Sequence, residues 1–188
     1  HYKNVRSRLM GIPTLITTTT ASGDSDVAFT NITSAYDEYM WVLTDINPGT
    51  NATALWINFS DDTSSWSYDL TKTSTFFSAM HREGDSETGL VYVAGFDIAQ
   101  GTGYIRLGHD DTGSGADESF AGILHLFNPA STTFVKHFYG RGNNYHHDDY
   151  VEDGFIAGYI NTTAAVTAIN FQPDQGVFDG VIQMYGIS

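Results

Sequence analysis

The segment Tyr39-Met-Trp-Val-Leu-Thr-Asp-Ile46 gives the clearest indication of the fold class of this chain. It is rich in aromatic and β-branched residues, which favour an extended strand. Successive side chains of a strand point to opposite faces, so Tyr39, Trp41 and Leu43 face one way and Met40, Val42 and Ile46 the other. A strand that is apolar on both sides predicts an outer surface covered by another subunit or, alternatively, by large loops.

The rest of the chain follows the same extended pattern. Residues 133–141 are also two-sided, and no window longer than about ten residues has helical spacing. Asp outnumbers Glu 17 to 5, so strong helix formers are scarce. We therefore predict an all-β fold, a two-sheet antiparallel sandwich of jelly-roll type with less than about 10% helix. The expected strands cover residues 15–20, 27–32, 39–46, 54–59, 71–79, 90–96, 104–107, 120–127, 133–141, 154–160, 165–171 and 180–185.

Composition excludes several classes of partner. The chain of 188 residues has 8 Lys and Arg against 22 Asp and Glu, a formal charge of -14. A nucleic-acid groove needs clustered cations, and so does docking on an anionic membrane, so neither partner is expected. Cysteine is absent, which removes disulfides and thiolate metal sites. The 41% hydrophobic content is enough for a folded core.

The first fourteen residues differ from the remainder. Residues 1–14 are predicted to be a short N-terminal arm or linker, and residues 15–188 one sandwich domain. The arm holds Lys3, Arg6 and Arg8, three of the chain's eight cations. We expect it to dock on an acidic neighbouring copy or a larger assembly; the alternative is a frayed terminus.

The loop 108–118 is the most ligand-like stretch. Asp110, Asp111, Asp117 and Glu118 offer hard oxygen ligands on a flexible backbone, which calcium prefers. The spacing is not that of an EF-hand loop. The alternative to a calcium site is an acidic loop exposed to solvent.

A second polar cluster lies in residues 145–153. Its adjacent His146 and His147 point to opposite faces if the chain is extended, so one metal could bind both only at a sharp turn. Otherwise a zinc or iron site would need a distant histidine, such as His109, His125 or His137. A surface loop whose histidines titrate between about pH 5 and 8 is the simpler interpretation.

Aromatic residues near loops are candidate glycan contacts. Trp66, Tyr68, Tyr145 and Tyr150 could stack on sugar rings, or they could close the ends of the sandwich. Neither a Gly-x-Ser-x-Gly elbow nor a His-Glu-x-x-His motif is present, and no distinctive catalytic acid stands out. We therefore expect a protein that is not an enzyme, with calcium as its one candidate cofactor.

Three stretches together resemble a known class of proteins. They are residues 29–43, residues 122–129 and the closing Gly180-Val-Ile-Gln-Met-Tyr-Gly-Ile187. This pattern resembles virion structural proteins of tailed bacteriophages, especially marine ones, whose β-sandwich closes with a strand reading roughly G-x-I-x-[LM]-Y-G-I. The resemblance covers about residues 15–187. It implies a fibre, tail-appendage or head-decoration protein on the outside of the particle, made in the host cytoplasm.

Three functions follow in order of preference. The first is a non-enzymatic virion component that assembles with copies of itself, as a trimer by analogy with phage appendages, and with other virion proteins. The second is a carbohydrate-binding, lectin-like module, with or without calcium, that attaches to a host surface glycan. The third is a metal-dependent or glycan-cleaving enzyme. In the closing strand, Ile182 and Met184 share one face and are expected in the core.

Overall fold

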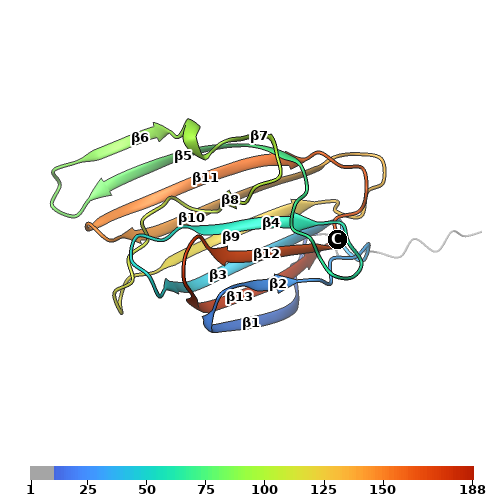
Figure 1. Ribbon diagram of the computed structural model, residues 1–188, viewed down its shortest axis with the longest axis horizontal. Helices are drawn as coiled ribbons and strands as arrows, with labels where there is room; N and C mark the ends of the chain where they lie inside the picture. The colour runs from blue at the N-terminus through green and yellow to red at the C-terminus, as the bar shows by residue number, and fades with distance from the viewer. Residues whose placement is uncertain (1–10) are drawn as a thin grey trace, which may run out of the picture.

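The computed structural model describes residues 11–188 and shows an all-β protein, with 57% strand and 2% helix (Figure 1). Two antiparallel sheets, one of nine strands and one of four, pack face to face as a sandwich. This confirms the predicted fold class. No helix within residues 11–188 is long and apolar enough to cross a membrane.

The nine-stranded sheet forms the larger layer. Its order is β1-β13-β3-β9-β10-β11-β5-β6, and β7 also pairs with β5. These strands are β1 (Thr14–Asp24), β13 (Phe178–Ile187), β3 (Glu38–Pro48), β9 (Phe120–Phe127), β10 (Lys136–His146), β11 (Tyr150–Ile160), β5 (Lys72–Arg82), β6 (Thr88–Tyr92) and β7 (Ile98–Gly101).

The four-stranded sheet has the order β2-β12-β4-β8 and lies over one face of the larger sheet (Figure 1). Its strands are β2 (Val27–Phe29), β12 (Ala168–Pro173), β4 (Leu55–Ser60) and β8 (Ile105–Arg106). Aromatic rings from both layers meet between them. The ring centroids of Phe29 and Phe171 in the small sheet lie 6.3 and 6.2 Å from that of Trp41 in β3. The ring centroid of Phe59 lies 5.4 Å from that of Phe138 in β10. Apolar burial of this kind is the main stabilising term of the fold.

The closing strand behaves as predicted. Ile182 and Met184 are fully buried, while Val181, Gln183 and Tyr185 are half-buried on the other face. The strand pairs with β1 on one side and β3 on the other. A terminal strand held on both sides resists fraying.

Three expectations about strands need correction. Ile46 is buried with Tyr39, Trp41 and Leu43 and does not share a face with Met40. A register shift between Leu43 and Ile46, with Asp45 at a φ of 53°, inserts a β-bulge that reverses the alternation.

The two other corrections concern strand ends. β10 begins at Lys136, so Phe134 lies before the strand and is 68% exposed. The strand expected over residues 90–96 is β6 followed by the 3-10 turn η1 (Ala94–Phe96). Strand β7 was not predicted, because Ile98–Gly101 is short and ends in glycine.

The predicted arm lies mostly outside the described residues, and so do Lys3, Arg6 and Arg8. Where the description begins, the N–H of Gly11 donates to the carbonyl of Ser188 at 3.0 Å. Strand β1 starts at Thr14, one residue before the predicted domain boundary.

Candidate functional site

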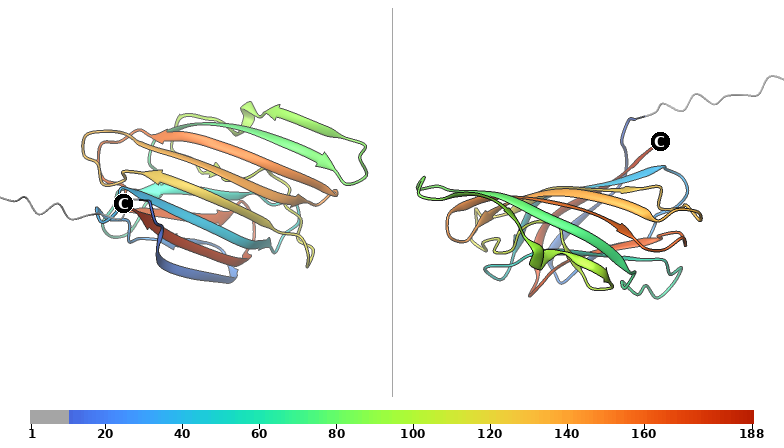
Figure 2. Two further views of the ribbon diagram at one scale, coloured as in Figure 1. Left: turned by 180° about the vertical axis from the view of Figure 1, so that it is seen from behind. Right: turned by 90° about the horizontal axis from the view of Figure 1, so that it is seen from above.

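One face of the nine-stranded sheet is turned away from the small sheet (Figure 2, left). We call it the outer face. It carries rows of apolar and aromatic side chains across neighbouring strands. One row runs through the paired residues Tyr92, Phe77, Phe155, Arg141 and Ile123, from β6 to β9. Tyr92 is 61% exposed, Phe77 42% and Ile123 41%. These side chains therefore meet solvent in the isolated chain.

The rings in this row contact one another. Phe77 and Phe155 stack with centroids 4.7 Å apart and planes within 5°. The guanidinium carbon of Arg141 lies 5.0 Å from the centre of the Phe155 ring. Arg141 also donates hydrogen bonds to Asp153, from Nε at 2.8 and 3.1 Å and from Nη2 at 2.6 Å. The row is thus largely apolar, and its one cation is paired with a carboxylate.

A second row crosses the centre of the outer face. It passes through Tyr139, His125, Met40 and Tyr185, which are partners on β10, β9, β3 and β13. The rings of His125 and Tyr139 stack at 4.7 Å, and Tyr139 is 50% exposed. Both strands that the sequence marked as two-sided therefore present apolar side chains on this face. The loops of residues 11–188 do not cover them, contrary to the alternative considered from sequence.

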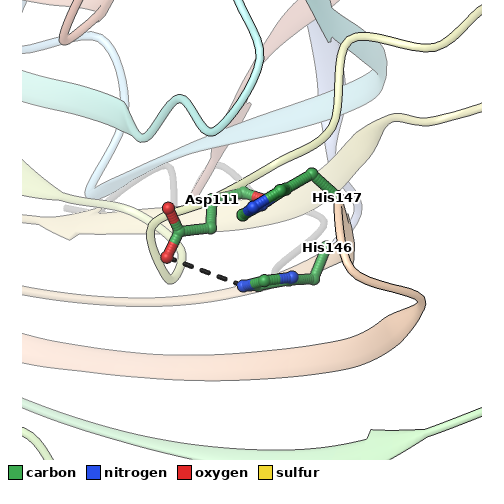
Figure 3. A group of neighbouring side chains, drawn as sticks. All are labelled: Asp111, His146 and His147. Carbon is green, nitrogen blue, oxygen red and sulfur yellow. Dashed lines mark hydrogen bonds and ion pairs between the residues drawn. The ribbon is translucent and has the colours of Figure 1, made fainter.

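The tip of the β10–β11 hairpin holds a second candidate site. Asp111 from the 108–118 loop, His146 at the end of β10 and His147 in the following turn come together (Figure 3). One potential ligand atom from each lies within 4.8 Å of the others. The two imidazole rings stack at 4.4 Å. His146 Nε2 lies 3.6 Å from Asp111 Oδ2.

Adjacent histidines can share one site only at a sharp turn of the chain, and His146 and His147 lie at such a turn. The chain turns sharply after His146, so both rings lie on the same side and face one carboxylate. The distant histidines His109, His125 and His137 do not belong to this cluster. His109 instead contacts Glu152, and His125 contacts Glu38 on the outer face. The pairing of Asp111 with the hairpin was missed because the loop and hairpin are far apart in sequence.

The structure does not bring together the four carboxylates of the predicted calcium loop; in residues 11–188, only the histidine cluster gathers three potential ligands. Asp110 accepts a hydrogen bond from Arg106, and Asp117 is exposed. Glu118 folds back over its own loop and accepts the N–H of Gly115. Gly113 makes this possible, because a Cβ there would lie 2.1 Å from Glu118 Oε2. Asp111 alone joins another ligand set.

The predicted glycan contacts fall into two separate pairs. Trp66 and Tyr68 lie in the loop before β5, whereas Tyr145 and Tyr150 lie at the β10–β11 hairpin (Figure 1). Lys72 at the start of β5 pairs with the end of β11, and Arg82 at its other end pairs with Tyr150. The two pairs therefore lie at opposite ends of the sandwich and form no common surface.

The tyrosines at the hairpin are held by charged neighbours. Arg82 stacks over one face of Tyr150, with its Cζ 4.1 Å from the ring centre. Tyr150 Oη donates to Glu87 at 2.6 Å, and Tyr145 Oη donates to Asp149 at 3.1 Å. The Asp149 hydrogen bond, with smaller contributions from burial and Glu83, raises the pKa of Tyr145 to about 12. Tyr145 and Tyr150 line a shallow groove together with His81, Arg82, Glu83, Asn143, Asn144 and Val151.

Comparisons with known proteins add no identification: the chain matches no family model and no curated protein.

Proposed function

We propose that this protein is a non-enzymatic structural component of a phage particle and that it assembles by packing its outer face against further copies of itself. The observation that carries the proposal is the half-exposed aromatic row from Tyr92 to Ile123. Apolar patches of this kind on a soluble domain are typical of interaction surfaces. The reason for proposing a phage particle is the resemblance to phage virion proteins in residues 29–43, 122–129 and 180–187.

Charge supports a second copy as the occupant. The chain has a net charge of -14, so two copies repel each other over most of their surfaces. On the outer face, the charge of Arg141 is paired with that of Asp153. Copies can approach through the row around Arg141 with little like-charge repulsion, while acidic surfaces elsewhere keep assembled particles dispersed.

Strand β6 extends the same surface to the sheet edge. Leu90 and Tyr92 are 76% and 61% exposed, and Val91 between them is 46% exposed. β6 pairs with β5 on one side and ends the strand order of its sheet. An uncovered edge with apolar side chains readily takes up another chain. We propose a trimer, the state typical of the phage appendages that the sequence resembles.

The experiment is to purify particles of a phage whose genome encodes this chain and to identify their proteins by mass spectrometry. The proposal predicts that the chain is present in a fixed number of copies per particle, a multiple of the number in its oligomer. A chain that is abundant in the infected lysate but missing from washed particles would contradict the proposal.

A lectin-like role is the second candidate, and one observation favours it. The groove at the hairpin presents Tyr145 beside the amide of Asn143 and the charged groups of Arg82 and Glu83, a combination of ring and hydrogen-bonding groups that suits sugars. Screening the protein on a glycan array tests this role. Binding that is lost in Tyr145→Ala and kept in Trp66→Ala supports it, and an array without signal contradicts it.

A further inference from the structure

We propose that Asp111, His146 and His147 bind one divalent transition-metal ion, of which Zn²⁺ is the best-fitting example. The basis is the convergence of two imidazoles and one carboxylate within 4.8 Å at the hairpin tip (Figure 3). Two histidines and one carboxylate form a known ligand set for such ions. The site is independent of the outer face and of the proposed role in a particle.

The backbone holds Asp111 in place before any ion arrives. Thr112, which is 3% exposed, forms β-bridges to Thr53 on one side and to His146 on the other. The N–H of Gly113 donates to the carbonyl of Tyr145 at 3.0 Å. Asp111 itself has a φ of 69°, a left-handed conformation that Asp tolerates better than most residues. The carboxylate therefore faces the histidines without a large rearrangement of the loop.

The hydrogen bonds of His147 suit it to ligation through Nε2. Its Nδ1 lies 3.3 Å from the carbonyl oxygen of Asp111, so Nδ1–H can donate to that oxygen and leave the lone pair of Nε2 free. The same carbonyl accepts the backbone N–H of His147 at 3.0 Å. A backbone carbonyl on the second ring nitrogen is the usual arrangement for a metal-binding histidine.

His146 needs one local change. Its Nδ1 accepts the N–H of Asp148 at 3.0 Å, which places the ring proton on Nε2, the nitrogen that faces Asp111. For Nε2 to bind an ion, the proton must move to Nδ1, and the Asp148 amide must turn toward solvent. Asp148 and Asp149 are exposed, so this movement stays within the turn. It gives the proposal a specific signature at the Asp148 amide.

The ligand types favour zinc over calcium. Ca²⁺ takes six to eight oxygen ligands, whereas this cluster offers two nitrogens and one carboxylate. Imidazole suits Zn²⁺, Ni²⁺ and Co²⁺, and water would complete the coordination. The carboxylate of Asp148, with its Oδ2 3.7 Å from His147 Nε2, adds negative charge next to the site. A bound ion would tie the 108–118 loop to the β10–β11 hairpin and restrict both.

The test is calorimetric titration of the full chain with ZnCl₂ alone, in a buffer that does not chelate zinc. We expect one saturable site that requires both rings, so His146→Ala and His147→Ala should each lose it. Asp111→Asn should weaken affinity at least about tenfold, because loss of even an outer-shell partner costs about 10–100-fold. Circular dichroism of each variant should match the parent chain, since all three side chains are partly exposed.

His81→Ala is the matched control. His81, at the end of β5, has its Nε2 3.1 Å from Oδ1 of Asp85 in the following turn, and both side chains are exposed. This contact pairs one imidazole with one carboxylate but has no second ring. Its loss should leave zinc binding unchanged. In ¹H–¹⁵N spectra of the parent chain, zinc should shift the Asp148 amide peak. Absence of saturable binding, or equal binding by the parent and the His147→Ala variant, would overturn the proposal.

Discussion

Lys72 and Lys136 lie on either side of Ile160 in one cross-strand row, and both side chains are fully buried. Lys72 Nζ donates to the carbonyls of Leu70 and Gly103, at 2.8 Å each. Lys136 Nζ donates to the carbonyls of Phe134 and Thr162, at 3.1 Å each. In a chain with so few cations, two therefore serve to fasten loops at one end of the sandwich, where buried carbonyls need donors.

The first prediction concerns pH and Lys72. Burial lowers the pKa of Lys72 to about 8, and Asp69 opposes this only in part. Above pH 8 the folded chain loses this proton while the unfolded chain keeps it to about pH 10.5, so the Lys72 contribution to stability rises with pH. Each pH unit above the folded pKa adds about 1.36 kcal/mol to the free energy of unfolding, so the increase by pH 9.5 is about 2 kcal/mol.

Urea unfolding at pH 7 and pH 9.5 measures this contribution when the parent chain is compared with Lys72→Met. The gain should be present in the parent and absent from the variant. Using the difference between the two chains cancels the titration of tyrosines, which both share. Equal pH dependence in the two chains would show that Lys72 is not a buried cation.

The second prediction concerns His109 and Glu152. His109 Nδ1 lies 3.1 Å from Glu152 Oε2, although the approach is too oblique for a well-formed hydrogen bond. Burial alone would lower the pKa of His109, but the Glu152 carboxylate and, to a smaller extent, Asp110 together outweigh burial, so the net pKa is raised. The stabilisation is therefore fully present below about pH 6.5 and is lost as pH rises through the raised pKa.

Glu152→Gln should consequently destabilise the fold more at pH 5.5 than at pH 8.5, by about 1–2 kcal/mol, the scale of a charged contact that is partly exposed. Denaturant unfolding at the two pH values measures it. Asp85→Asn is the control, because the exposed His81–Asp85 pair contributes little at either pH. A penalty for Glu152→Gln that does not change with pH would argue against this pair.

The third prediction concerns the closing strand. Ile182 is fully buried between β1 and β3, and Ile182→Asp would place an unpaired carboxylate there. The cost is several kcal/mol, a large part of the about 5–15 kcal/mol that holds a domain together. We expect the variant to be insoluble or unfolded on expression. Gln183→Asp, on the opposite face of the same strand, should remain soluble; a soluble Ile182→Asp protein with normal melting would show that the strand is peripheral.

Much of the fold follows from short-range pattern. The alternation of apolar and polar residues located most strands. Because Ile182 and Met184 are two residues apart, they share one face of their strand, and both lie in the core as predicted. The predicted face of Ile46 was wrong, because the β-bulge at Asp45 reverses the alternation and cannot be recognised by counting residues along the strand. Strand partners depend on contacts between distant segments, so the unequal sizes of the two sheets could not be read from spacing.

The candidate sites show the same division. The two-sided pattern of residues 39–46 and 133–141 correctly indicated an apolar outer face. The stacking of Phe77 on Phe155 depends on the register between β5 and β11, which local sequence does not specify. Likewise, the meeting of Asp111 with His147 requires the 108–118 loop to reach a hairpin that follows it by many residues. Acidic residues that are close in sequence, in contrast, point to different partners in the fold.

If the outer face packs against further copies, the molar mass of the chain in solution must exceed that of one chain. Light scattering at micromolar concentration should give a multiple of the 20.6 kDa chain mass, three times that value for a trimer. Phe155→Ser should shift the mass toward the monomer without changing the circular dichroism spectrum. Phe134→Ser, which alters an exposed ring outside the strands of the outer face, should assemble as the parent does. A parent chain that scatters as a 20.6 kDa monomer under these conditions would contradict assembly through the outer face.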